Sequence, residues 1–176
     1  MSKQQLQDYA FKYSGVTYEE SLEAINIKPS IYERIGDKGF MKLSELFYER
    51  VFNDDDAAWF LNIFSSSTKN EAVDNQFRFF VQTFGGPDLY RQKKGKYTRL
   101  AGRHANYNIG TNAANRWVMH MDNAIDEHKE LKEDIECRQL LKKYFTYTAH
   151  YIVTAMTYMR SDQLSGGTKI DSGRVW

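Results

Sequence analysis

Apolar side chains recur at helical spacing through most of the chain. In residues 37–53 they return every three or four positions, which predicts a helix with a broad buried face. The same spacing predicts helices in residues 69–84, 111–128 and 134–160. No segment of useful length alternates polar and apolar side chains with the period of two that a half-buried strand requires. The predicted fold class is therefore all-α.

Helix start signals divide the chain further. A Ser or Thr followed three positions later by Glu, the capping-box spacing, occurs at Thr17, Ser30 and Thr68. The polar segment 2–14 carries spaced apolar residues and ends at Gly15, as a short amphipathic helix does. We expect three parts: an N-terminal helical extension over residues 1–30, the main domain over residues 31–160, and a flexible glycine- and serine-rich tail over residues 161–176.

Two further helix starts lack the capping-box spacing. Asp, Asn and Thr favour the first position of a helix because their side-chain oxygens accept hydrogen bonds from its free N–H groups. Asp55 or Asp56 is therefore expected to cap a short aromatic turn. Thr111 or Asn112 is expected to cap the helix that follows.

Composition narrows the class of partner. The chain of 176 residues holds 24 Lys and Arg against 23 Asp and Glu, so it lacks the positive surplus typical of nucleic-acid-binding proteins. No apolar run approaches the length of a membrane span, and the first residues lack the apolar centre of a signal peptide. We therefore expect a cytoplasmic protein with no nucleic-acid or membrane partner. The single cysteine, Cys137, excludes an intrachain disulfide, and no phosphate-binding loop or HExxH zinc signature is present.

The four histidines differ in their settings. His128 lies in a run of charged residues and is expected to face solvent. His120 and His150 lie within predicted helices and are more readily explained as hydrogen-bonded core or boundary residues than as ligands. His104 lies in the glycine-rich segment 85–110, and a long irregular segment of this kind is usually functional or a linker. His104 is either satisfied by a backbone carbonyl or holds a metal.

Tyr48, Gln76 and Trp117 lie on predicted helices and could donate hydrogen bonds to a bound ligand. Dioxygen on ferrous haem iron carries partial negative charge, so donors about 3 Å away would stabilise it and slow its release. The alternative is that Tyr48 faces solvent, Gln76 bonds a neighbouring helix and Trp117 is plain core. Both interpretations stay open on the residues alone.

Several short motifs together resemble the truncated haemoglobins, and within them group II of the plant and algal type. No single motif is specific, but their order and spacing over roughly residues 31–159 are. The residues that carry the resemblance are Phe47-Tyr48-Glu-Arg-Val51, Asn75-Gln76 through Gln82, Gly85-Gly-Pro87, Leu89-Tyr90, Gly95, Leu100, Arg103-His104 and Arg116-Trp117.

The resemblance implies a globin-like two-over-two helical sandwich that holds haem b between two helix pairs. It implies that His104 is the proximal ligand of a five-coordinate iron, and that Tyr48, Gln76 and Trp117 are the distal donors. It also implies haem contacts from Phe64, Ala72, Phe79, Phe80, Tyr90 and Arg103, the last two near the propionates. The family's proline-containing stretch after the proximal histidine is replaced here by Ala105-Asn-Tyr-Asn108.

The implied function is reversible binding of dioxygen, and of NO and CO, for oxygen binding, storage or sensing. The alternative is redox turnover, as a nitric oxide dioxygenase or a peroxidase-like protein that depends on an external reductase. We place binding ahead of turnover because the distal helices lack the histidine and arginine pair that assists peroxide cleavage. A haem-free interaction domain is a third hypothesis, and a homodimer is compatible with each of them.

Overall fold

The computed structural model describes residues 1–95 and 109–165, with side chains up to residue 161. Within these ranges every regular element is a helix, which confirms the all-α prediction. In the described ranges each helix is too short or too polar to serve as a membrane span. The elements are α1 (Lys3–Ser14), α2 (Tyr18–Asn26), α3 (Ile31–Phe52), η1 (Asp55–Ala57), α4 (Ala58–Leu61), η2 (Asn62–Phe64), α5 (Lys69–Thr83), α6 (Leu89–Lys94), α8 (Thr111–Glu127), α9 (Lys129–Glu133) and α10 (Ile135–Ser165).

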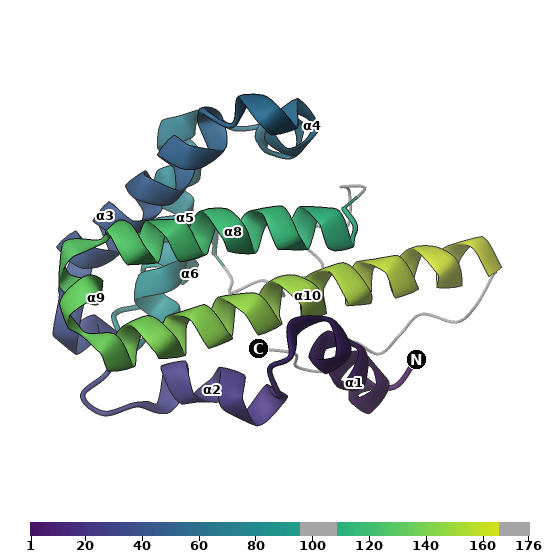
Figure 1. Cartoon of the computed structure of the whole chain (residues 1–176), viewed down its shortest axis with the longest axis horizontal. Coiled ribbons are helices and arrows are strands. Elements are labelled where there is room, and N and C mark those ends of the chain that lie inside the picture. Colours follow the sequence, from purple (N-terminus) through teal and green to yellow (C-terminus); the bar gives the residue numbers. More distant parts are fainter. Residues whose placement is uncertain (96–108, 166–176) are drawn as a thin grey trace.

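Two helix pairs cross to form the body of the domain. Helix α3 packs on α5, α8 packs on α10, and α3 also contacts α8 (Figure 1). Aromatic rings join the two pairs: Phe80 of α5 lies 4.9 Å from Phe145 of α10, and Phe47 of α3 lies 5.0 Å from Trp117 of α8, between ring centroids. This is the predicted two-over-two sandwich.

The capping boxes that the sequence predicts are all formed. At Thr17, Ser30 and Thr68 the hydroxyl accepts from a backbone N–H of the first turn, and a glutamate returns a bond to the cap. Gly36 interrupts α3 with φ 61° and ψ −169°, a conformation that favours glycine because a side chain would be strained there. Local sequence therefore decides where these helices begin and bend.

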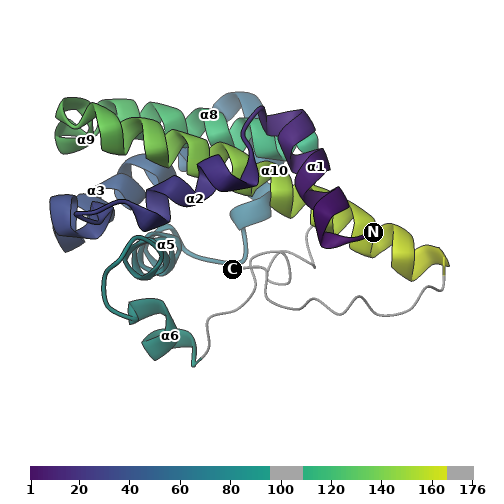
Figure 2. The same cartoon turned by 90° about the horizontal axis from the view of Figure 1, so that it is seen from below.

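The N-terminal extension lies on one face of α10. Helices α1 and α2 both pack against α10 (Figure 2), where Leu6 and Ala10 are buried with Tyr147 and Tyr151. Tyr13 stacks on His150, with ring centroids 6.4 Å apart. The extension thus covers a strip of α10 that would otherwise expose two tyrosine rings.

Three local predictions were wrong. His128 is buried rather than solvated: its Nε2 donates to the Gly39 carbonyl at 2.9 Å, and its Nδ1 accepts from the N–H of Leu131 at 3.3 Å at the start of α9. Neither Asp55 nor Asp56 caps the aromatic turn, since the residue at that position is Asp54, whose carboxylate is bound elsewhere. The N-cap residue of α8 is Gly110, which has no side chain to form a cap, so neither Thr111 nor Asn112 occupies that position.

The glycine-rich segment is not irregular throughout. It contains the short helix α6, which ends at Gly95 with φ 75°. Residues 96–108 of this segment, including His104 and Arg103, lie outside the described residues. Helix α10 continues to Ser165, so the predicted tail begins within a helix, and residues 166–176 lie outside the described residues.

Candidate functional site

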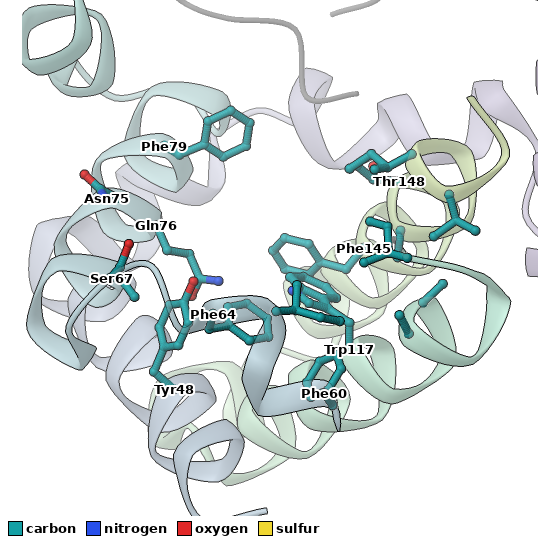
Figure 3. A pocket seen from close by; sticks show the side chains of 18 of the residues that line it. Tyr48, Phe60, Phe64, Ser67, Asn75, Gln76, Phe79, Trp117, Phe145 and Thr148 are labelled. Atoms are coloured by element: carbon teal, nitrogen blue, oxygen red, sulfur yellow. The ribbon is translucent and has the colours of Figure 1, made fainter. Parts of the chain in front are cut away.

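A cavity of about 300 Å³ lies between the two helix pairs. That volume is at the lower end of the range of about 300–1,000 Å³ typical of ligand pockets. Helices α3 and α5 form one wall and α8 and α10 the other, with residues of α4 and η2 at one end (Figure 3). Its lining is mainly aromatic and small apolar side chains, including Phe60, Ile63, Phe64, Ala72, Phe79, Phe80, Ile109, Ala113, Ala114, Phe145, Ala149, Ile152 and Val153.

Tyr48, Gln76 and Trp117 come from three different helices, and all three line this cavity. Figure 3 shows Tyr48 and Gln76 on one side of the open space and Trp117 on the other. The Tyr48 ring is 8% exposed and meets Phe64 edge-on at 5.8 Å between centroids. The expectation that Tyr48 faces solvent is therefore excluded.

Among the described residues, none supplies a partner for the oxygen of the Gln76 amide. The Oε1 atom is buried and accepts no hydrogen bond, so Gln76 does not bond a neighbouring helix through it. Trp117 packs its ring on Phe47 and Phe145, and among the described residues its indole N–H meets no acceptor. Buried polar groups are normally satisfied, so the Gln76 oxygen has room for a donor from a ligand or from water, while the amide N–H₂ and the indole N–H can donate to a ligand.

Thr148 of α10 is a further exception. Thr83, Thr154 and Thr157 each donate to the carbonyl four residues earlier, at 2.7, 2.9 and 2.9 Å. Thr148 is more buried, lines the cavity and makes no such bond. Its hydroxyl, like the oxygens of Gln76 and Asn75, is a buried polar atom of a cavity-lining residue for which the described protein supplies no partner.

The other predicted haem contacts divide into three sets. Phe64, Ala72, Phe79 and Phe80 line the cavity. Tyr90 of α6 is buried behind them and meets Phe79 edge-on, with centroids 5.6 Å apart.

Arg103 and His104 lie outside the described residues, so the proximal side of the predicted site is not part of the described geometry. Lys93, near the end of α6, binds Asp74 at 2.5 Å.

One cluster of charged residues close to the cavity went unnoticed in the sequence. Asp54, at the end of α3, is bound by Arg116 through two hydrogen bonds of 2.8 and 2.5 Å and by His120 Nε2 at 2.6 Å. The bonds from Arg116, followed by that from His120, lower the pKa of Asp54 from 3.8 to about 2, although burial opposes the shift. The one available signal was the spacing of Arg116 and His120, which places them one turn apart on α8.

The chemistry of this cavity fits a haem group. Flat aromatic walls suit a large apolar macrocycle, and the unpartnered Gln76 amide suits a small polar ligand on one side of it. Ala72 is small, so the wall formed by α5 leaves room beside the donors. The aromatic walls thus suit an apolar porphyrin, and the polar side chains suit a small polar ligand beside it.

Comparison with known proteins gives the chain its family. The sequence pattern of the family described as bacterial-like globin matches residues 30–154. Two-on-two hemoglobin-3 from Arabidopsis thaliana is 41% identical over 150 residues, which span 85% of this chain and 82% of that protein. Group 2 truncated hemoglobin 3-1 from Lotus japonicus is 37% identical over 87% of this chain and 88% of its own.

Solved structures agree. A truncated oxygen-avid haemoglobin from Bacillus subtilis superimposes with a TM-score of 0.61 at 31% identity, covering 70% of this chain and 98% of that one. A thermostable hemoglobin from Thermobifida fusca gives a TM-score of 0.62 at 30% identity, covering 70% and 96%. The chain therefore belongs to the bacterial-like globin family, as a group II truncated haemoglobin of the two-on-two type.

Proposed function

We propose that this protein binds dioxygen reversibly at a five-coordinate haem b whose iron is held by His104. Haem is the cofactor of its family. When bound, the ferrous iron supplies the coordination site for the gas and passes electron density to it. The observation that supports the proposal is that three side chains able to donate hydrogen bonds, Tyr48, Gln76 and Trp117, come from three helices and line one aromatic cavity.

The three donors would hold the polar end of the gas. Gln76 can present its amide N–H₂ and Trp117 its indole N–H, while the Tyr48 hydroxyl comes from the third helix. A net hydrogen bond of about 1–1.5 kcal/mol slows release by about 5- to 13-fold. Three donors would therefore give slow release, which suits storage or sensing. NO and CO fit the same space, and CO gains less from the donors because it carries less negative charge.

The remaining residues would hold the porphyrin. Phe64, Phe79 and Phe80 offer aromatic faces and edges, while Ala72 keeps the distal side open. We assign Tyr90 and Arg103 to the propionate edge, where the tyrosine is supported by its packing on Phe79.

Binding is favoured over peroxide turnover by the state of the nearby basic groups. Fast peroxide cleavage is helped by a general acid-base, typically histidine with arginine, beside the reacting oxygen. Among the residues that the structure describes, neither a histidine nor an arginine lines the cavity. His120 is bound to Asp54, and Arg78 binds Asp74 at 3.0 Å.

Absorption spectroscopy tests the proposal. Protein supplied with haem should show a Soret band and distinct ferric, ferrous and oxygenated spectra, and His104→Ala should lose or alter them. A chain that stays colourless with haem in excess would leave only the haem-free interaction domain. Nitrate formed from the oxygenated protein and NO, with a reductase in excess, would instead establish dioxygenase turnover with an external reductase as partner.

A further inference from the structure

A buried carboxylate ties the end of α3 to α8 beside the cavity. The side chain of Asp54 is 4% exposed, and Arg116 and His120 between them occupy both of its oxygens. Arg116 and His120 lie four residues apart, so they project from the same face of α8 one turn apart. Two attachment points on one helix face fix the rotation of that helix about its axis as well as its position.

The cluster contacts the cavity at two places. Arg116 directly precedes Trp117, so the rotation of α8 that Asp54 sets also sets the direction of the indole. His120 stacks on Phe60 at 5.7 Å with an interplanar angle of 26°, and Phe60 lines the cavity beside Trp117 (Figure 3). Phe60 in turn packs on Phe64 at 5.2 Å between centroids.

Stability alone does not account for such a cluster. Removing a charged pair from water is costly, and a well-packed apolar replacement is often as stable or more so. What bidentate hydrogen bonding does supply is a fixed geometry. A fixed geometry matters for Trp117, because the ring contacts that its indole makes within the described residues are with Phe47 and Phe145, and such contacts tolerate sliding.

We propose that Asp54, Arg116 and His120 are positioning residues that hold the Trp117 indole at the angle required to donate to the bound gas. The inference rests on the proposed donor role of Trp117. Asp54 acts through α8 and does not touch the ligand. Of the three residues, Arg116 belongs to the motifs by which the sequence resembles its family, and Asp54 and His120 do not.

The first test uses haem-free protein, so it does not depend on the proposed function. The indole N–H of Trp117 is followed by ¹H–¹⁵N NMR and identified by its loss in Trp117→Phe. Asp54→Asn should shift and broaden that signal, and so should Arg116→Lys, which keeps the charge but loses the two-point contact. Asp134→Asn is the matched control, because it breaks a second carboxylate–arginine contact, with Arg34 at 3.3 Å, outside the cavity lining. A Trp117 signal that superimposes on wild type in both cluster variants would overturn the inference.

The second test uses the haem-loaded protein. Asp54→Asn should speed oxygen release by about threefold, part of the factor expected for losing one donor completely. The same change made in Trp117→Phe should have no effect, because the indole through which it acts is gone. An equal effect in both backgrounds would show that the cluster does not work through Trp117. If the protein takes up no haem, the proposed function fails while the NMR result still decides the positioning role.

Discussion

Replacing Gln76 by leucine should make the haem-free protein more stable and the haem-loaded protein worse at retaining oxygen. In the described structure Gln76 Oε1 is buried without a partner, and such an atom costs about 1–3 kcal/mol. The cavity of about 300 Å³ admits water, which places the expected gain near the lower end, at about 1 kcal/mol. For a chain of this size that raises the melting temperature by about 2–4 °C.

The opposite sign is expected once haem and oxygen are bound. Gln76→Leu removes a donor to the gas, so the oxygen dissociation rate should rise about 5- to 13-fold. Urea unfolding of the haem-free protein followed by circular dichroism gives the first quantity, and stopped-flow oxygen displacement gives the second. A variant that is more stable without haem but releases oxygen faster would indicate that Gln76 serves ligand binding rather than stability.

Gln82 supplies a control of the same residue type on the same helix. Its Oε1 accepts the backbone N–H of Arg91 at 2.9 Å at an exposed site, so Gln82→Leu removes a hydrogen bond that water can replace and should destabilise the protein by about 0.5 kcal/mol. If Gln76→Leu and Gln82→Leu lower stability alike, or if oxygen release from Gln76→Leu matches wild type, the assignment of Gln76 as a donor is refuted.

Three further predictions concern groups described above. Thr148→Val should raise the unfolding free energy of the haem-free protein by about 1 kcal/mol, because its buried hydroxyl has no partner among the described residues. Urea titration measures this change, and a loss of stability would contradict the prediction. The pKa of Asp54 is lowered from 3.8 to about 2, so its ionised form stabilises the folded protein by roughly 2 kcal/mol. That stabilisation is present above about pH 4 and is lost as the pH falls toward 2. The difference in unfolding free energy between wild type and Asp54→Asn should therefore close over that range. Gly36→Ala should lower stability by about 1–2 kcal/mol through backbone strain alone, since φ is 61° and no atom lies within 4 Å of the added methyl; an unchanged melting curve would argue against that conformation.

Features set by neighbouring residues in the chain were predictable from the sequence. The capping boxes at Thr17, Ser30 and Thr68 each depend on four consecutive residues. Gln76 was recognisable as an amide within an apolar stripe of α5. The expectation that Tyr48, Gln76 and Trp117 meet in one cavity came from the family resemblance, because helix periodicity alone does not say which faces oppose each other.

Features that depend on distant contacts were missed. His128 was assigned to solvent from its charged neighbours, but its partner is the Gly39 carbonyl, 89 positions away. The partners of Asp54 lie 62 and 66 positions away, and three successive aspartates gave no sign of which one is buried. The sequence around a histidine or a carboxylate does not show which acceptor or donor a distant helix will bring into contact with it.

Helix α10 serves two structures at once. The strip that carries Tyr147 and Tyr151 seats the N-terminal extension, and the residues between them and just beyond, Thr148 and Ile152, belong to the cavity wall. A chain trimmed to residues 30–154, the part that the family pattern matches, would keep this part of the cavity wall but lose the N-terminal extension packed behind it. The rings of Tyr147 and Tyr151 would then be exposed to water. Gas affinities measured on such a shortened protein would describe a cavity whose α10 wall is held less firmly than in the full chain.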